Sequence, residues 1–253
     1  MYKFILHFLT AKNSHGFGVH SPYVFQFTND VIYKRSTNTL FLSIEKIRSK
    51  LKRDTKYLDI VDFGTGINRK KSIAEIASTS LKPAKYGQLL YRLSDFIKSR
   101  NTLELGTSFG LTTSYLATSS STCRIVSLEG SQQIADIANE NFSILDIKNI
   151  QIVVGNIDET LTKVVNEFNQ FELVFIDANH RSTAVLKYFE MILSKVHSDS
   201  VLVIDDIYWS SDMEYAWKII KDHPGVTSTI DLFQMGIVFF NSDLHKKHYK
   251  MRF

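Results

Sequence analysis

The chain has 253 residues, of which 44% are hydrophobic and 22% charged, with a formal net charge of +4 at pH 7. This composition is that of an ordinary globular protein and excludes a disordered or collagen-like chain. The single cysteine, Cys123, excludes an internal disulfide framework and a cysteine metal cluster, and it fits a reducing compartment. No apolar run reaches the roughly 20 residues of a membrane span, so we expect a cytoplasmic protein without one.

The N-terminal part is basic and helical in pattern. Residues 1–71 hold 13 Lys and Arg against 5 Asp and Glu, a net +8, which leaves −4 for the rest. This portion could face an anionic substrate, RNA or a membrane surface, or it could be a solvated face. Helices are predicted near 22–34, 41–53 and 85–98, and Ser21 and Pro22 suit the start of the first. We expect residues 1–83 to form an extension, whose aromatic-rich first 33 residues could form a homodimer contact.

From residue 102 onward, strands and helices alternate. Continuous apolar runs such as Leu173–Ile176 and Val201–Ile204 indicate strands covered on both faces, hence a parallel sheet. Near the C-terminus, two strands share a very short connection around Phe233–Met235, which permits only an antiparallel pair. The predicted fold is a doubly wound α/β domain over residues 84–253, with a mostly parallel sheet of seven strands and a frayed tail at 245–253. The strands are expected at 102–105, 124–128, 150–154, 172–176, 200–204, 226–231 and 234–240, and the helices near 110–119, 131–145, 158–168, 181–196 and 212–221.

The most informative segment is a glycine turn between the first core strand and its helix. It reads Glu104-x-Gly106-x-x-x-Gly110, and the next strand ends on Glu129. Glycines let the backbone approach a ligand where a Cβ would clash, and a carboxylate such as Glu129 can accept hydrogen bonds from both hydroxyls of a ribose. Glu104 would repel a pyrophosphate but suits a cationic ligand. The pattern predicts a nucleoside-type cofactor cleft.

This turn and the later Glu129 resemble the cofactor motifs of class I S-adenosylmethionine-dependent methyltransferases. The resemblance implies that the glycine turn cradles the methionine portion, that Glu129 anchors the ribose, and that Gly155-Asn156 lies at the adenine. Upstream, Lys85–Leu90 resembles a segment that lies against the cofactor in relatives. The implied cofactor-binding residues are Glu104, Gly106, Thr107, Ser108, Gly110, Glu129, Gly130, Asn156 and Asp177.

Three carboxylates follow two further strands. Asp177 comes after Leu173–Ile176, and Asp205 with Asp206 follows Val201–Ile204. Carboxylates at neighbouring strand ends repel one another unless a divalent cation such as Mg²⁺ binds them. Because adjacent strand residues point oppositely, Asp205 and Asp206 can share an ion only if the chain turns there. The alternative is that Asp177 caps a helix and Asp206 contacts cofactor or substrate.

The surrounding residues, Val174–His180 and Val203–Trp209, resemble the metal-bearing segments of cation-dependent O-methyltransferases, a group that includes catechol and caffeoyl-coenzyme A enzymes. By position, Asp177, Asp205 and Asp206 become metal ligands. Two departures, His180 for the family's lysine and Asp206 for its asparagine, instead resemble the macrocin and sugar O-methyltransferase branch. They argue against a catechol-type acceptor.

The resemblance implies methyl transfer to an oxygen of a small molecule, with His180 as general base beside Asp177. His180 could instead only hydrogen-bond locally at a helix start. Rival functions are a metal-independent N- or RNA methyltransferase and a non-catalytic cofactor-binding module. The chain shows no aromatic and basic platform for stacking bases, which argues against nucleic acid. A second glycine turn, Asp62–Gly66 with basic residues 69–71, is interpreted as a loop that could form a lid over an anionic substrate, and the role of the turn-rich residues 16–22 is left open.

Overall fold

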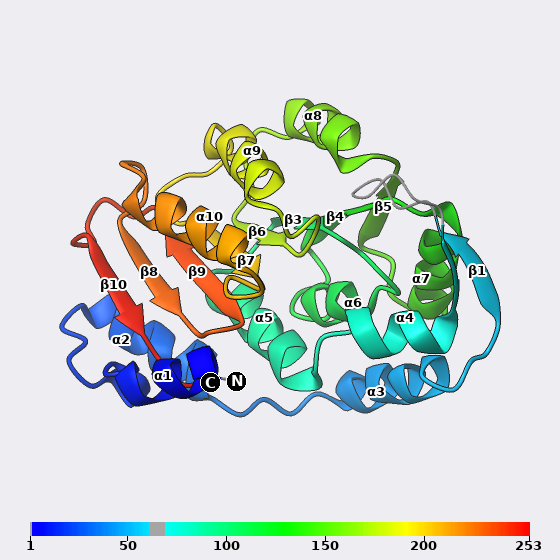
Figure 1. Cartoon of the computed structure of the whole chain (residues 1–253), viewed down its shortest axis with the longest axis horizontal. Coiled ribbons are helices and arrows are strands. Elements are labelled where there is room, and N and C mark those ends of the chain that lie inside the picture. Colours follow the sequence, from blue (N-terminus) through cyan, green and yellow to red (C-terminus); the bar gives the residue numbers. More distant parts are fainter. Residues whose placement is uncertain (1, 61–68) are drawn as a thin grey trace. The chain divides into compact units, whose positions relative to one another are not determined.

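The structure is a computed structural model that describes residues 2–60 and 69–253. The chain forms two compact units, one combining residues 1–35 with 168–253 and the other comprising residues 36–167 (Figure 1). The N-terminal 35 residues therefore fold with the C-terminal third of the chain. Among the described residues, no helix combines the length and apolar character needed to cross a bilayer.

The unit of residues 36–167 is built on parallel strands in the order β3-β4-β5. In their register, Leu103 lies opposite Val126, and Val126 lies opposite Gln151. A separate antiparallel pair, β1 and β2, joins the outer helices. The buried side chains beneath α3, α4 and α6 form a common apolar core that includes Ile44 and Tyr115. The elements are α3 Thr39–Leu51, β1 Tyr57–Ile60, β2 Arg69–Ser72, α4 Ile73–Ser80, α5 Ala84–Phe96, β3 Asn101–Leu105, α6 Leu111–Ala117, β4 Arg124–Glu129, α7 Gln132–Ile144, β5 Ile150–Val154 and α8 Ile157–Glu167.

The other unit contains strands in the order β10-β8-β9-β7-β6. β6 and β7 are parallel, whereas β9 runs antiparallel to both β7 and β8, as the short connection predicted. Ser21 caps α2 by accepting a hydrogen bond from the Val24 N–H, and Pro22 occupies the first turn, also as predicted. The elements are α1 Tyr2–Thr10, η1 Ser14–Gly16, α2 Pro22–Phe27, η2 Thr28–Tyr33, β6 Leu173–Ile176, α9 Ser182–Leu193, β7 Val201–Asp205, α10 Ser211–Asp222, β8 Ser228–Asp231, β9 Met235–Phe239 and β10 Lys247–Lys250.

The α/β class and the mostly parallel sheet are confirmed, but the sheet has eight strands rather than seven. The additional strand is β10, which pairs in parallel with β8, where a frayed tail was expected. The Asn13 N–H donates to the Lys250 carbonyl at 3.1 Å, and the Lys250 N–H donates to Asn13 Oδ1 at 3.1 Å. The order of the tail thus depends on Asn13, which lies 237 positions before Lys250. Local sequence pattern cannot reveal such a distant contact.

A second difference concerns residues 57–72. The predicted loop at Asp62–Gly66 lies outside the described residues, but Arg69–Ser72 forms strand β2, paired with β1. The run Arg69-Lys70-Lys71 lacks apolar alternation and therefore looks like a loop in sequence. Ser72 ends this strand and caps α4 in a reciprocal arrangement with Glu75.

Candidate functional site

The predicted glycine turn lies where β3 runs into α6. The N–H groups of Gly106 and Thr107 both donate to the Leu128 carbonyl, at 2.9 and 3.2 Å. Gly106, Ser108 and Gly110 all have positive φ angles, of 102°, 49° and 75°. The turn is thereby fixed against the end of β4, in a backbone conformation that favours glycine.

Gly110 is required for two separate reasons. Its φ of +75° is one that L side chains rarely adopt, and a Cβ there would lie 2.5 Å from the Phe142 ring. It is also the N-cap of α6, and Asn141 Nδ2 of α7 donates to the neighbouring Phe109 carbonyl at 2.9 Å. The close approach of α7 to the turn therefore depends on glycine at this position.

Glu129 joins the turn to the next helix. Its Oε2 accepts from the Ser108 N–H at 2.8 Å, and its Oε1 accepts from the Ser131 N–H at 3.0 Å. Each carboxylate oxygen has two lone pairs, so both oxygens keep capacity for a further hydrogen bond. The structure thus places Glu129 and Ser108 together as predicted, and it orients the carboxylate by two backbone donors.

Burial raises the pKa of Glu129 above its ordinary value of 4.5, although the N–H groups of Ser131, Ser108 and Gly130 act to lower it. The raised pKa by itself stabilises the fold below pH 4.5, and this stabilisation is lost as pH rises through the folded-state value. Cofactor binding should follow the opposite trend, because a protonated carboxyl loses acceptor capacity.

We therefore expect the dissociation constant of S-adenosylhomocysteine to rise as pH falls from about 7 to about 5, and to rise less in E129Q, which has no proton to gain. Titration calorimetry across this range measures the effect. Identical pH profiles for the two proteins would contradict the role of Glu129.

Glu104 has a different environment from the one predicted. Its side chain is fully buried, and Oε2 accepts hydrogen bonds from Thr113 Oγ1 at 2.5 Å and Ser127 Oγ at 2.6 Å. Ser127 also shares a hydrogen bond with Thr107 Oγ1 at 2.6 Å. Glu104 thus stabilises the strand and turn through buried hydroxyls, and direct contact with a cofactor stays a prediction.

Asn156 directly precedes α8, and its oxygens accept hydrogen bonds from the first turn of that helix. Its Oδ1 accepts from the Asp158 N–H at 3.1 Å, and its carbonyl accepts from the N–H groups of Glu159 and Thr160 at 2.9 Å. The preceding Gly155, with φ +140°, donates its N–H to the Glu129 carbonyl. The ends of β4 and β5 therefore lie together, and Asn156 is placed beside the residue predicted to hold the ribose.

Two further residues of the predicted cofactor segments lie in this unit, Ser108 in the turn and Gly87 in α5. The Ser108 hydroxyl oxygen is buried and has no hydrogen-bond partner within residues 2–60 and 69–253. Gly87, in the segment predicted to lie against the cofactor, lets α5 pack on α6, since a Cβ there would lie 2.3 Å from the Tyr115 ring.

The second predicted half-site lies in the other unit, at the ends of β6 and β7. Asp177 follows β6, and its Oδ1 lies 3.7 Å from His180 Nε2. Asn179 and His180 have positive φ angles of 66° and 30°, so the chain bends sharply back after Asp177. The Asp177 side chain is 15% exposed and that of His180 35% exposed, which leaves the imidazole open to a substrate.

Asp205 and Asp206 follow the neighbouring strand. Asp205 is the last residue of β7, buried and opposite Met235 of β9, whereas Asp206 has a φ of 53°. The chain therefore does turn at this point, which was the condition for the two carboxylates to share an ion. The structure brings Asp177 and His180 together, but it does not group the three acids.

The donor chemistry of Asp177, Asp205 and Asp206 suits Mg²⁺, whose preferred ligands are oxygens. Their positions do not fit: in the described parts of the chain, no three His, Cys, Asp or Glu side chains are grouped so that they could hold a metal ion. The predicted metal set stays a prediction, and no chemical step is derived through it.

Sequence inspection missed two residues that shape this half-site. Asp212 at the start of α10 accepts from both the N–H and the Oγ of Ser182, each at 2.6 Å, and so fixes the start of α9. These hydrogen bonds lower the pKa of Asp212. Asp231 at the end of β8 accepts from the Tyr208 hydroxyl at 2.6 Å. Neither residue lies in a recognisable motif, because each acts through a partner 23 or more positions away.

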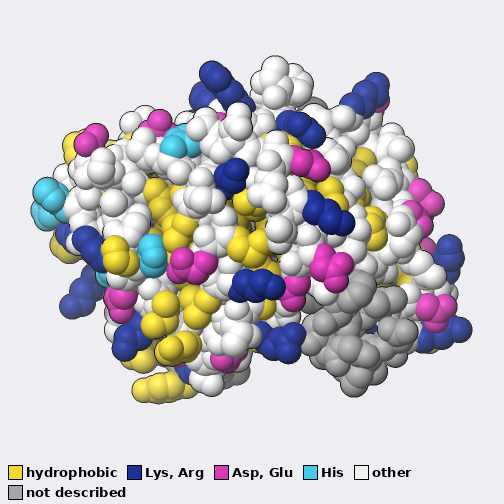
Figure 2. Space-filling view, turned by 90° about the horizontal axis from the view of Figure 1, so that it is seen from above, with side chains coloured by type: hydrophobic (Ala, Val, Ile, Leu, Met, Phe, Trp, Pro, Cys, Tyr) yellow, Lys and Arg dark blue, Asp and Glu magenta, His cyan; other side chains and the backbone are white. Residues whose placement is uncertain are grey.

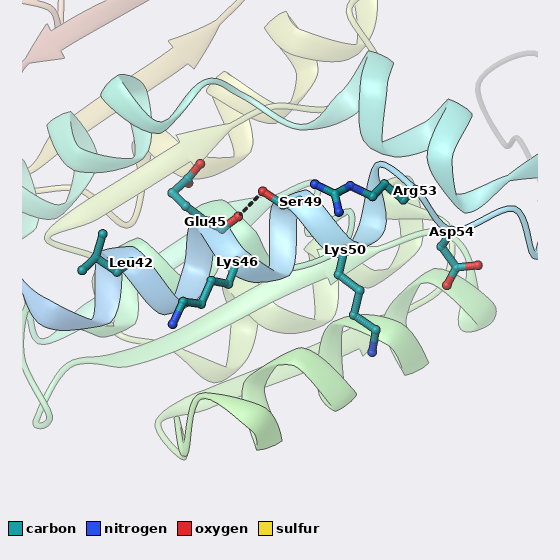
Figure 3. A pocket seen from close by; sticks show the side chains of 7 residues that line it. All are labelled: Leu42, Glu45, Lys46, Ser49, Lys50, Arg53 and Asp54. Carbon is teal, nitrogen blue, oxygen red and sulfur yellow. Dashed lines mark hydrogen bonds between the residues drawn. The ribbon is translucent and has the colours of Figure 1, made fainter.

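A groove of about 770 Å³ borders α3 in the unit of residues 36–167 (Figure 3). Glu45, one of its lining residues, accepts hydrogen bonds from Tyr115 Oη and Arg48 Nε. None of the predicted site residues lines it. The lining residues are Leu42, Glu45, Lys46, Ser49, Lys50, Arg53 and Asp54.

Residues 103–207, from β3 to the turn after β7, match the family model described as a methyltransferase domain. Two catechol O-methyltransferases are similar in sequence. The one from Mycobacterium tuberculosis is 29% identical over 160 residues, covering 58% of this chain and 71% of that protein. The one from Niastella koreensis is 28% identical over 141 residues, covering 54% of this chain and 62% of that protein.

Solved structures agree at the level of the fold. An O-methyltransferase from Bacillus cereus in complex with S-adenosylhomocysteine has a TM-score of 0.59 at 22% identity, and covers 86% of this chain and 97% of its own. The O-methyltransferase TomG from Streptomyces achromogenes, in complex with S-adenosylmethionine, has a TM-score of 0.56 at 18% identity. The match covers 64% of this chain and 82% of that chain.

The fold, the glycine turn and the matched domain together identify a methyltransferase. The two relatives that match it in sequence are both O-methyltransferases. The predicted methyltransferase class is thus confirmed, and S-adenosylmethionine as its cofactor stays a prediction.

Proposed function

We propose that this enzyme transfers the methyl group of S-adenosylmethionine to a hydroxyl oxygen of a small molecule, with the cofactor held at the β3–α6 turn. The observation that carries the proposal is the contact between Glu129 and the Ser108 N–H, which presents a carboxylate and a glycine turn to one ligand. Glu129 would accept from the ribose hydroxyls, and Asn156 with Gly155 would lie at the adenine. The methionine portion would rest on Gly106, Thr107, Ser108 and Gly110, with Gly130 as a backbone neighbour and Glu104 supporting the turn.

His180 is the proposed general base. Its imidazole would take the proton of the acceptor hydroxyl, while Asp177, 3.7 Å from Nε2, would stabilise the imidazolium. The acceptor oxygen would then form a bond to the methyl carbon as the carbon–sulfur bond breaks, and the sulfonium would leave as a neutral thioether. Because the methyl donor is already activated, positioning the two reactants supplies much of the acceleration.

The test is to measure S-adenosylhomocysteine released with a panel of acceptors that includes a catechol, a sugar and an amine. We expect turnover with a hydroxyl acceptor and none with the amine. Turnover with only the amine or with RNA would identify the rival transferases. Tight cofactor binding without turnover on any acceptor would favour a non-catalytic module.

Replacing His180 by alanine should lower kcat about 10²- to 10⁴-fold, which is the usual contribution of a general base, with little change in cofactor affinity. The exposed His20 offers a matched control, since it lies in another segment of the same unit. If H180A and H20A turned over at the wild-type rate, His180 would have only a local role.

Dependence on a divalent cation is tested by EDTA. The resemblance predicts that EDTA abolishes turnover and that added Mg²⁺ restores it, with Asp177, Asp205 and Asp206 as ligands. Full turnover in EDTA would assign the reaction to His180 and Asp177 without an ion. The cytoplasmic location and the homodimer also stay predictions.

A further inference from the structure

The first helix, α1, is oriented with its polar residue inward and its apolar residues outward. His7 is its one buried residue, at 4% exposure, whereas Tyr2 is 77% and Leu9 is 70% exposed. Ile5 and Leu6 are exposed as well, at 51% and 46%. A helix of a globular protein ordinarily has the reverse arrangement, with its apolar stripe facing the core.

Four of the six exposed apolar residues of α1 form one stripe; the other two, Phe4 and Phe8, pack against Phe233 and Arg252. At about 100° per residue, Tyr2, Ile5, Leu6 and Leu9 fall within a sector of about 100° that points away from His7. The inward side is fixed by specific contacts. His7 Nε2 lies 3.0 Å from the Met251 carbonyl oxygen, and Nδ1 lies 3.4 Å from Asp231 Oδ1. Turning the apolar stripe of the helix inward would therefore break the contacts of His7 with Met251 and Asp231.

Basic side chains border this stripe at the C-terminal end of α1. Lys250 Nζ donates to Thr10 Oγ1 at 2.9 Å, and Arg252 Nε donates to the Phe8 carbonyl at 2.9 Å. The Arg252 guanidinium also lies 4.1 Å from the centre of the Phe8 ring. Lys12 follows the helix and is exposed. At the lower left of Figure 2, hydrophobic side chains lie among side chains of both charges, Lys and Arg as well as Asp and Glu.

We propose that this surface, defined by the stripe of Tyr2, Ile5, Leu6 and Leu9 with the cations Lys12, Lys250 and Arg252, binds the surface of an anionic lipid bilayer. An exposed apolar helix face bordered by Lys and Arg is suited to lie in the plane of the membrane, with apolar side chains at the headgroup boundary. The cations attract anionic headgroups. A second copy of the chain would instead bring the same cations together across the contact.

The test is co-sedimentation of the full chain with vesicles. We expect binding to phosphatidylcholine vesicles containing about 30% phosphatidylglycerol to exceed binding to pure phosphatidylcholine vesicles about tenfold or more. Binding should fall as salt is raised from about 0.05 to about 0.5 M, because screening shortens the reach of the cations. Equal binding to both kinds of vesicle, or no binding to either, would overturn the proposal.

Leu9→Glu should reduce the binding about tenfold, since it places a negative charge in the apolar stripe. Leu42→Glu is the matched control, because Leu42 is also 70% exposed but belongs to α3 of the other unit. For the cations, Lys12→Glu is compared with Lys52→Glu, which is exposed at the end of α3. Circular dichroism establishes that each variant is folded.

Equal loss in L9E and L42E, or in neither, would overturn the assignment to α1. Wild-type dimers that become monomers in L9E, without vesicle binding by the wild type, would assign the stripe to a second copy instead. None of these measurements depends on methyl transfer, so they remain decisive whatever the acceptor is.

Discussion

The substitution Glu129→Gln is expected to weaken binding of S-adenosylhomocysteine about 100-fold. Glutamine keeps the size of the side chain but removes its charge, and its NH₂ group would face either the Ser108 or the Ser131 N–H, both of which now donate to the carboxylate. The proposed hydrogen bonds from the ribose hydroxyls to the charged carboxylate contribute about 1.5–3 kcal/mol each, and weakening both to bonds with a neutral amide corresponds to about 100-fold in affinity. Titration calorimetry measures the change directly.

A matched control is Glu140→Gln on the exposed side of α7, which should bind as the wild type does. An E129Q protein that keeps wild-type affinity would remove Glu129 from the cofactor site. A fall in affinity accompanied by unfolding would instead indicate that Glu129 acts mainly by fixing the turn, so the melting temperature is measured alongside.

The substitution Gly110→Ala is expected to destabilise the protein by about 2–5 kcal/mol. The left-handed backbone at φ +75° costs a non-glycine residue about 1–2 kcal/mol. Forcing a Cβ to within 2.5 Å of the Phe142 ring adds an overpacking cost of about 1–3 kcal/mol. Urea unfolding followed by fluorescence measures the loss, and cofactor binding should fall with it because the turn must shift.

Gly18→Ala separates the two costs. Gly18 has a similar φ of +66°, but the nearest atom to an added Cβ is 3.6 Å away. This variant should lose only the backbone part, about 1–2 kcal/mol. If G110A lost no more than G18A, the contact with Phe142 would be accommodated by movement of α7.

Much of the fold could be predicted from local pattern. The strands with continuous apolar runs, such as Leu173–Ile176 and Val201–Ile204, were placed within one residue, because burial on both faces leaves a clear signature. The pairing of Glu129 with the glycine turn was also predictable. Both lie at the carboxyl ends of adjacent parallel strands, where ligands of this fold bind.

The elements that were missed depend on partners distant in sequence. Strand β10 is polar, and its order comes from β8 and from Asn13. The role of Glu104 was similarly hidden, since Thr113 and Ser127 have no recognisable motif and approach it only in the folded sheet. The three aspartates were predicted to share an ion, but the structure does not group them, because grouping depends on how each side chain leaves its turn.

The pairing of the two chain ends has a consequence for synthesis on the ribosome. Asn13 and Thr28 have partners at Lys250 and Met251, and Phe27 packs edge-on against Phe239. The first 35 residues are translated early but cannot acquire these contacts until the last strand has emerged. Residues 36–167 can complete their own contacts in the meantime. The phenylalanines of the first 35 residues therefore stay exposed for longer, and a chaperone has the most time to bind there.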